Sequence, residues 1–320
     1  MFSPIVARRD AALKVQISSD RPLTLDGKPL RPGSGLVASE GKLALIREGA
    51  DVIAVVDGEA SAATSVPLRA PHGVASTPLR AVVSTRDWRG GFLLAFGSGR
   101  TPAERRVARV RLHGAEIESV HFDPRRMYEA LDELEGFTTS MLDLAGAAVL
   151  PKLGDGRERL RLFQRGHGAP KEGGPAYPAT VDIQLDALLG YLERTRKEPN
   201  FYFGCDLENP RQYDLGSVAG VPIAFGDAAA LASGKTLFLG TAEMTIGGTD
   251  ESEVIASVLG VIEVDGSARH AFINEADGEP TMRRAIGIAA IDAHKAILMV
   301  TDPNAPEAAA TLCTVTLEGV

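Results

Sequence analysis

A short pattern that returns five times is the feature that most constrains this chain. Each copy is a turn followed by a short apolar strand. The copies are SEGKLALIR (39–47), RGGFLLAFG (89–97), LAGAAVL (144–150), SGKTLFLG (233–240) and AHKAILMV (293–300). Repeats at such spacing are typical of solenoids, propellers and arrays. The pattern therefore predicts a repeat architecture before any single residue is considered.

Each copy belongs to a longer run of strands. Apolar residues alternate in VARVRL (107–112) and IESVHF (117–122), which is the period of strands with one buried face. Small residues at 228–230 and 289–290 precede two of the turns and suit crowded strands near an axis. We predict an all-β chain that forms a single β-propeller domain over residues 1–320, with five blades or, as the alternative, six.

The intervals between the copies are uneven, and the third interval is the longest. An insertion explains it without a sixth blade, because apolar residues recur at helical spacing within 185–197. Residues 124–133 also predict a short helix, with a proline at its start. The segment 13–17 is expected to close the ring by pairing with the C-terminal unit, which would remove an exposed sheet edge.

Composition narrows the class of protein. The chain has 320 residues, of which 44% are hydrophobic and 24% charged, as in folded globular proteins. A net charge of −8 without a Lys/Arg block argues against nucleic-acid binding, since phosphate contacts supply much of that affinity. No apolar run is long enough to predict a transmembrane helix, residues 1–10 do not predict a secretory leader, and Cys205 and Cys313 lack metal-ligand spacing. We expect a cytoplasmic protein that binds neither nucleic acid nor a membrane.

Residues at the same phase of each unit are expected to meet at one mouth of the central channel. Glu135, Asp227 and Ile286 stand before inner strands, and Glu243 and Asp302 follow apolar strands. Carboxylates from several blades suit calcium, which takes six to eight oxygen ligands. Glu135, Asp227, Glu243 and Asp302 are therefore candidate calcium ligands. The alternative is that Glu135, Asp227 and Asp302 accept hydrogen bonds from backbone N–H groups of turns.

Other side chains suggest chemistry at the same mouth. Arg165 ends an apolar strand, and it could hold an anionic ligand bidentately or pair with Glu135 or Glu243. His167 is a candidate general base, so Arg165 and His167 are the candidate catalytic residues. Trp88 is the one tryptophan, and it is expected to fill the core, with a ligand-stacking platform as the alternative.

Several short segments resemble bacterial propeller proteins in the style of the esterase-like phytase and the gluconolactonase-type propellers. They are LEGF (134–137), LFQRG (162–166), FGDAAAL (225–231), TAE (241–243) and LMVTD (298–302). The resemblance implies a propeller with a polar mouth that binds calcium or hydrolyses an ester. The chain departs from it at Ile286–Gly287, where such proteins look like Glu-Gly, and at 86–89, where an acidic residue would be expected.

Two functional hypotheses follow. The leading one is a ligand-binding or interaction scaffold with a polar channel mouth, whose partner is a small molecule or a protein on the propeller face. The competing one is a calcium-dependent hydrolase of the phosphatase, esterase or lactonase type that acts at the same mouth.

Overall fold

The structure is a computed structural model that describes residues 3–31, 33–47, 52–58, 60–68, 78–112, 118–154, 156–168, 170–171, 175–198, 200–245, 252–305 and 307–320. Strands dominate this part of the chain, which contains two short α-helices. The predicted all-β class is therefore confirmed. None of the described helices is long and apolar enough to cross a membrane.

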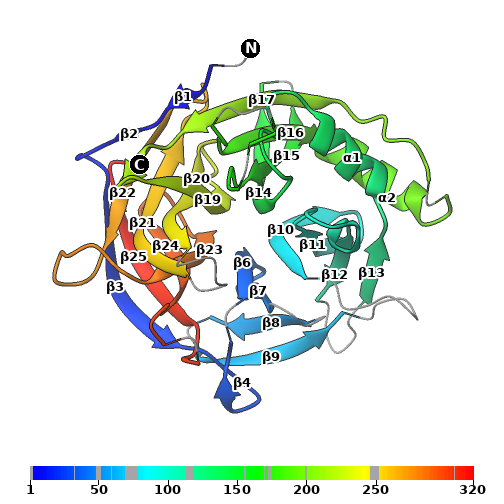
Figure 1. The fold of residues 1–320 in the computed structure, drawn as a ribbon. Coiled ribbons are helices and arrows are strands. Elements are labelled where there is room, and N and C mark those ends of the chain that lie inside the picture. Colours follow the sequence, from blue (N-terminus) through cyan, green and yellow to red (C-terminus); the bar gives the residue numbers. More distant parts are fainter. Residues whose placement is uncertain are drawn as a thin grey trace.

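Antiparallel meanders of four strands surround a central axis in a propeller-like arrangement (Figure 1). The first is β6 (Gly33–Ser39), β7 (Lys42–Arg47), β8 (Val52–Asp57) and β9 (Ala62–Pro67), and the second is β10 (Leu79–Asp87), β11 (Gly90–Gly97), β12 (Val107–Arg111) and β13 (Glu118–Phe122). The third is β14 (Leu144–Leu153), β15 (Arg157–Gln164), β16 (Ala179–Gln184) and β17 (Leu207–Asp214). The fourth is β19 (Val221–Ala230), β20 (Thr236–Thr245), β21 (Ser252–Ile262) and β22 (Ala268–Asn274). The last is β23 (Arg284–Ala290), β24 (Lys295–Thr301), β25 (Thr311–Glu318) and β3 (Lys14–Pro22).

The strands nearest the axis form a closed cycle. Each of β6, β10, β14, β19 and β23 contacts the next, and β23 contacts β6. We call these the inner strands. Their facing sides are rich in alanine and valine, which lets backbones approach the axis closely. The alanines at 228–230 and 289–290 do line the axis, as their small size predicts.

The N-terminal segment runs along the outside of the ring (Figure 1). Strand β1 (Ile5–Val6) pairs with β17, β2 (Arg8–Arg9) pairs with β22, and β4 (Thr24–Leu25) pairs with β9. Strand β5 (Lys28–Pro29) pairs with β4. Outside this segment, the short strand β18 (Ser217–Val218) pairs with β19. Strand β3 pairs antiparallel with β25, so N- and C-terminal strands share one sheet. This confirms the predicted closure and covers the edge that β25 would otherwise expose.

Short helices connect the strands of the second and third meanders. The 3₁₀ helix η1 (Pro102–Glu104) follows β11, and α1 (Arg125–Glu133) follows β13. Helix α2 (Leu185–Thr195) is inserted between β16 and β17 and packs against β13, β15 and β16. The helix predicted within 185–197 is therefore present, and it accounts for the length of the third unit.

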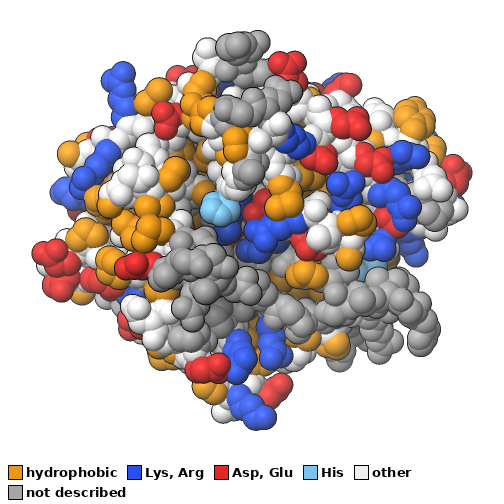
Figure 2. All heavy atoms as spheres, in the orientation of Figure 1, with side chains coloured by type: hydrophobic (Ala, Val, Ile, Leu, Met, Phe, Trp, Pro, Cys, Tyr) orange, Lys and Arg blue, Asp and Glu red, His pale blue; other side chains and the backbone are white. Residues whose placement is uncertain are grey.

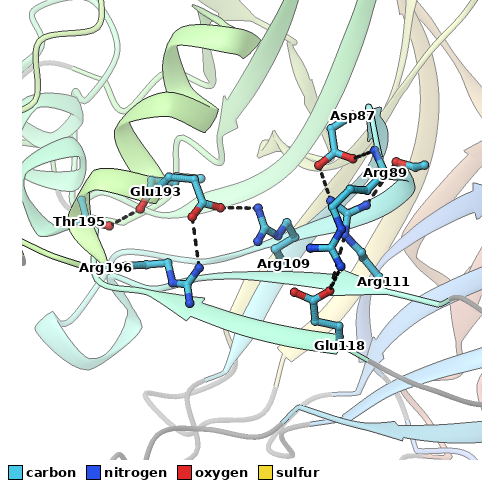
Figure 3. A network of polar contacts seen from close by, with 10 residues as sticks. Asp87, Arg89, Arg109, Arg111, Glu118, Glu193, Thr195 and Arg196 are labelled. Carbon is cyan, nitrogen blue, oxygen red and sulfur yellow. Dashed lines mark hydrogen bonds and ion pairs between the residues drawn. The ribbon is translucent and has the colours of Figure 1, made fainter.

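A polar network fixes α2 against the second meander (Figure 3). Arg109 of β12 pairs with Glu193 of α2, and Arg111 of the same strand pairs with Asp87 at the end of β10. In the figure, every carboxylate has an arginine partner. The Arg109–Glu193 pair of this network thus ties the inserted helix to the second meander.

The five copies of the recurring sequence pattern do not all lie on the same strand of their meanders. Four copies fall on the second strand of a meander, β7, β11, β20 and β24, whereas residues 144–150 lie in the inner strand β14. The corresponding turn of the third meander is marked by Gly154 and Gly156. Both kinds of strand are apolar because both are covered on two faces, so composition alone does not distinguish them.

Trp88 does not fill the core. It lies in the turn between β10 and β11, and 91% of its surface is exposed. The expectation that this residue packs inside the ring is wrong, because the tip of that turn is exposed to solvent.

Candidate functional site

A β-bulge interrupts each inner strand at a corresponding point. The register shifts between Ser34 and Leu36, Leu79 and Ala81, Leu144 and Gly146, Phe225 and Ala228, and Ala285 and Gly287. A bulge sets two residues opposite one and re-aims the side chains around it. Because each second strand ends beside the bulge of its neighbour, the starts of the inner strands and the ends of the second strands share one end of the ring.

Asp227 lies in the bulge of β19 and reaches two other inner strands. Its Oδ2 accepts the backbone N–H of Ile288 in β23 at 3.0 Å and that of Leu36 in β6 at 3.2 Å. Its side chain is almost fully buried. Gly146 of β14 makes room for it, since a Cβ there would lie 2.8 Å from the Asp227 Cα. The structure therefore shows Asp227 accepting backbone N–H groups across the axis.

The electrostatic state of Asp227 follows from this burial. Desolvation raises the pKa of its carboxyl to about 8, and the N–H groups of Ile288, Ala228 and Leu36 oppose that shift. No charged side chain contributes to the shift among the described residues. Its Oδ1 is buried and has no hydrogen-bond partner in the described part of the chain. At neutral pH this carboxyl is therefore mostly protonated.

Arg165 stands at the same end of the ring, directly after β15. Its backbone is fixed, because its N–H donates to the Asp143 carbonyl at 2.9 Å and its own carbonyl accepts from Phe225 at 3.2 Å. Its Nε lies 4.0 Å from Asp143 Oδ2, and that oxygen already accepts a hydrogen bond from Arg100 Nη2 at 2.6 Å. Within the described residues, Arg165 has no side-chain hydrogen bond. The expected pairing with Glu135 or Glu243 is replaced by this longer contact with Asp143.

The pKa of Arg165 reports its surroundings. Burial lowers the pKa, Asp143 and Glu243 raise it, and Arg80 and Arg100 lower it. Arg80 lies in the bulge of β10, is half-buried, and has no hydrogen bond or ion pair to any described residue. Two further arginines and two carboxylates therefore surround the Arg165 guanidinium.

Glu243 is engaged elsewhere. This residue of β20 forms an ion pair with Arg284, the first residue of β23. The pair bridges the fourth and the last meander. Glu243 is thus largely neutralised by Arg284 and is not the direct partner of Arg165.

We call this end of the ring the polar mouth and define it by Arg80, Arg100, Asp143, Arg165, Glu243 and Arg284. The group contains four guanidinium groups and two carboxylates, in a chain whose net charge is −8. Glu104 lies beside it and is hydrogen-bonded by Ser98 and Thr101. On the face drawn in Figure 2, basic side chains and a histidine gather near the centre of the ring.

The remaining predicted residues are dispersed. His167 is exposed in the loop two residues after Arg165, and Ile286 lies half-buried in the bulge of β23. Glu135 is exposed in the turn that follows α1, away from the inner strands. Asp302 is exposed after β24, where its Oδ1 accepts the N–H of Asn304 at 2.9 Å. Among the described residues, no group of three or more His, Cys, Asp or Glu could hold a metal ion.

Three residues of the polar mouth escaped sequence reasoning, namely Arg80, Asp143 and Arg284. Their signal was available in part, because each stands next to the start of an inner strand or the end of a second strand. The sequence pattern assigned residues 144–150 to a second strand, so Glu135 was expected to precede the inner strand. Because 144–150 in fact lie in the inner strand β14, the residue at the mouth is Asp143.

A comparison with protein families decides where the chain belongs. The model of the Family of unknown function (DUF6929) matches residues 29–317. The chain belongs to this family. The match spans every inner strand and every residue of the polar mouth of this family member. No curated protein matches the sequence.

Solved structures similar to this family member are remote in sequence. A gluconolactonase from Xanthomonas campestris is 14% identical with a TM-score of 0.42, and the match covers 92% of this chain and 73% of that one. Regucalcin from Agrobacterium tumefaciens, described as a calcium-binding protein, is 10% identical with a TM-score of 0.43 over 99% and 98%. A thermostable family-43 glycoside hydrolase is 10% identical with a TM-score of 0.47 over 92% and 91%. These values assign no activity to this chain.

Proposed function

We propose that this chain is a five-bladed β-propeller that binds a small anionic ligand, a carboxylate or a phosphate, at the polar mouth. The blade count rests on the closed cycle of the inner strands, each of which starts one meander. The insertion of α2 supports five blades over six, because it lengthens the third unit without adding an inner strand to the described cycle.

The state of Arg165 carries the proposal. Its side chain is half-buried, and the nearest carboxylate oxygen, 4.0 Å away, is already bonded to Arg100. A half-buried cation without a hydrogen-bonded counter-ion keeps its donors free for a bound anion. A planar guanidinium matches the two oxygens of a carboxylate or phosphate in a bidentate pair. An anion between Arg165 and Arg80 would supply the missing counter-charge.

Hydrolysis at the same mouth is the alternative proposal. It assigns acid–base chemistry to His167, substrate binding to Arg165, and calcium binding to Glu135, Asp227, Glu243 and Asp302. The buried state of Asp227 and the Arg284 pair of Glu243 favour anion binding over metal binding. Calcium added to the chelated protein should raise the melting temperature only if the alternative holds.

Arg165→Met is expected to weaken binding of inorganic phosphate by about tenfold or more, because methionine keeps an unbranched apolar stem but removes the charge and the fork of donors. Isothermal titration calorimetry at low ionic strength measures the change. The matched control is Arg126→Met, since Arg126 lies exposed on α1 and pairs with Glu129 outside the polar mouth.

The free protein gives a second readout. Without ligand, Arg165→Met should be about as stable as the wild type in urea unfolding, since the half-buried guanidinium makes only a 4.0 Å contact with Asp143 and no side-chain hydrogen bond to a described residue. Unchanged phosphate affinity in Arg165→Met would refute the proposed site. A marked loss of stability in the free variant would instead assign Arg165 a structural ion pair.

A further inference from the structure

A cavity borders both the first and the last meander. It has a volume of about 480 Å³, which is within the range of small-molecule sites. Its described lining consists of residues 25–26 and 28–31 around the β4–β5 hairpin, Arg47 at the end of β7, and Glu307 in the loop between β24 and β25. This lining shares no residue with the polar mouth. We call the cavity the rim pocket.

Arg47 is the residue of the first meander that corresponds to Arg165 of the third. In each second strand, one residue pairs with the inner strand directly before the bulge, and this residue is Ile46 in β7 and Gln164 in β15. Arg47 and Arg165 are the residues that follow. Arg47 is half-buried like Arg165, and its side chain has no hydrogen bond or ion pair to any described residue. The rim pocket is therefore lined by a guanidinium whose donors are free within the described part of the chain.

The charges around the rim pocket leave one positive charge in excess. Arg31 and Glu307 form an ion pair, so these two side chains neutralise each other. Lys28 and Arg47 are the remaining cations of the described lining, and Asp26 is its remaining carboxylate. Both Lys28 and Asp26 are exposed. A ligand with a single negative charge would balance this set.

Apolar side chains line the rim pocket as well. Leu25 and Leu30 are core residues that are 7% and 1% exposed, and they pack with other apolar residues of the first meander. Pro29 lies between the charged residues of the hairpin, and the aliphatic stem of Arg47 adds further apolar surface. A ligand that fits this wall must therefore carry an apolar part beside its negative charge.

We propose that the rim pocket binds a small carboxylate with an unbranched apolar tail, of the fatty-acid class. The carboxylate pairs with the guanidinium fork of Arg47, and Lys28 supplies a second positive charge. The tail packs against Leu25 and Leu30, where each buried methylene group adds to the affinity. This site is distinct from the polar mouth and does not depend on the anion proposed there.

The test follows the methyl NMR signals of Leu25 and Leu30 while hexanoate, acetate or hexylammonium is added at neutral pH. The protein carries Arg165→Met, so that anion binding at the polar mouth does not contribute. Hexanoate should shift the signals of both leucines saturably, with an affinity about tenfold or more above that of acetate, because its tail is longer. Hexylammonium, which has a similar tail and the opposite charge, should bind at least about tenfold more weakly than hexanoate. The wild type should give the same hexanoate affinity as Arg165→Met.

Two further variants in the same background assign the binding to named side chains. Arg47→Met should weaken hexanoate binding about tenfold or more, whereas Arg126→Met on α1 should leave it unchanged. Asp26→Asn should tighten hexanoate binding about threefold, because it removes a carboxylate that repels the ligand. Asparagine also accepts the φ of 53° that Asp26 adopts in its turn. Asp302→Asn is the matched change at an exposed carboxylate elsewhere, and it should have no effect.

Equal binding of hexanoate and hexylammonium would overturn the proposal, as would an unchanged hexanoate affinity in Arg47→Met. Should Arg47→Met fail to fold, Asp26→Asn decides, since an affinity no tighter than that of the parent protein would overturn the proposal. The absence of a saturable shift at Leu25 and Leu30 would also overturn it, whatever the result for phosphate at the polar mouth.

Discussion

Asp227→Ala is expected to lower the free energy of unfolding by about 2–4 kcal/mol at pH 5. The change removes the acceptor of two buried N–H groups, which belong to Leu36 and Ile288 on other inner strands. Each buried N–H left without a partner costs about 1–3 kcal/mol. Part of this loss is offset, because the folded wild type must keep a proton on the carboxyl that the unfolded chain releases.

Urea unfolding at pH 5 measures this effect, and Asp302→Ala is the matched control. Asp302 is exposed and accepts one turn N–H, from Asn304, so its removal should change the free energy of unfolding by about 0.5 kcal/mol or less. If Asp227→Ala were as stable as the wild type at pH 5, the carboxyl would not hold the inner strands together.

The stability of the wild type is expected to fall as pH rises from 5 to 8, with a contribution from Asp227 of up to about 1.4 kcal/mol per pH unit. The sign follows from the raised pKa. The folded carboxyl has a pKa of about 8, against 3.8 for the ordinary group, so between these values the folded state binds a proton that the unfolded state does not. Below the lower pKa, both the folded and the unfolded protein carry this proton, and its contribution to stability is fully present. That contribution decreases as pH rises and is lost once pH passes the upper pKa.

Asp227→Asn isolates this contribution, because an amide of the same shape has no proton to release. Unfolding curves of the two proteins, recorded at several pH values, should diverge by roughly 3–4 kcal/mol between pH 5 and pH 8, with the variant gaining. The contributions of all other titrating groups cancel in the difference between the two free energies of unfolding. Parallel curves would show that Asp227 titrates normally and that its burial does not govern its charge.

The architecture could be predicted because its signals are local. Period-two alternation in 107–112, helical spacing in 185–197 and apolar residues at 13–17 each lie within a few residues of the contacts that they predict. The structure places a strand, a helix and the closing strand β3 there. A strand points successive side chains alternately to the core and to the solvent, so its sequence alternates apolar and polar residues.

The polar mouth could be predicted only in part, because its geometry depends on which strand of each meander reaches the axis. Residues 144–150 share the composition of a second strand, yet ring closure makes β14 an inner strand. Arg165 and Glu243 were recognised at the mouth, whereas Asp143 was not. Ion-pair partners from different meanders, such as Glu243 and Arg284, are set by the packing of the ring and have no signature in local spacing.

The central claim is that an anion completes the polar mouth, and selenate crystallography tests it most directly. Selenate has the shape and charge of a phosphate-like oxyanion, and its anomalous signal marks its position in crystals soaked with it. The account predicts a peak within hydrogen-bond distance of the Arg165 guanidinium, on the side facing Arg80, and no such peak in Arg165→Met crystals. An unoccupied mouth in which Arg165 is bonded directly to Asp143 or Glu243 would contradict the account.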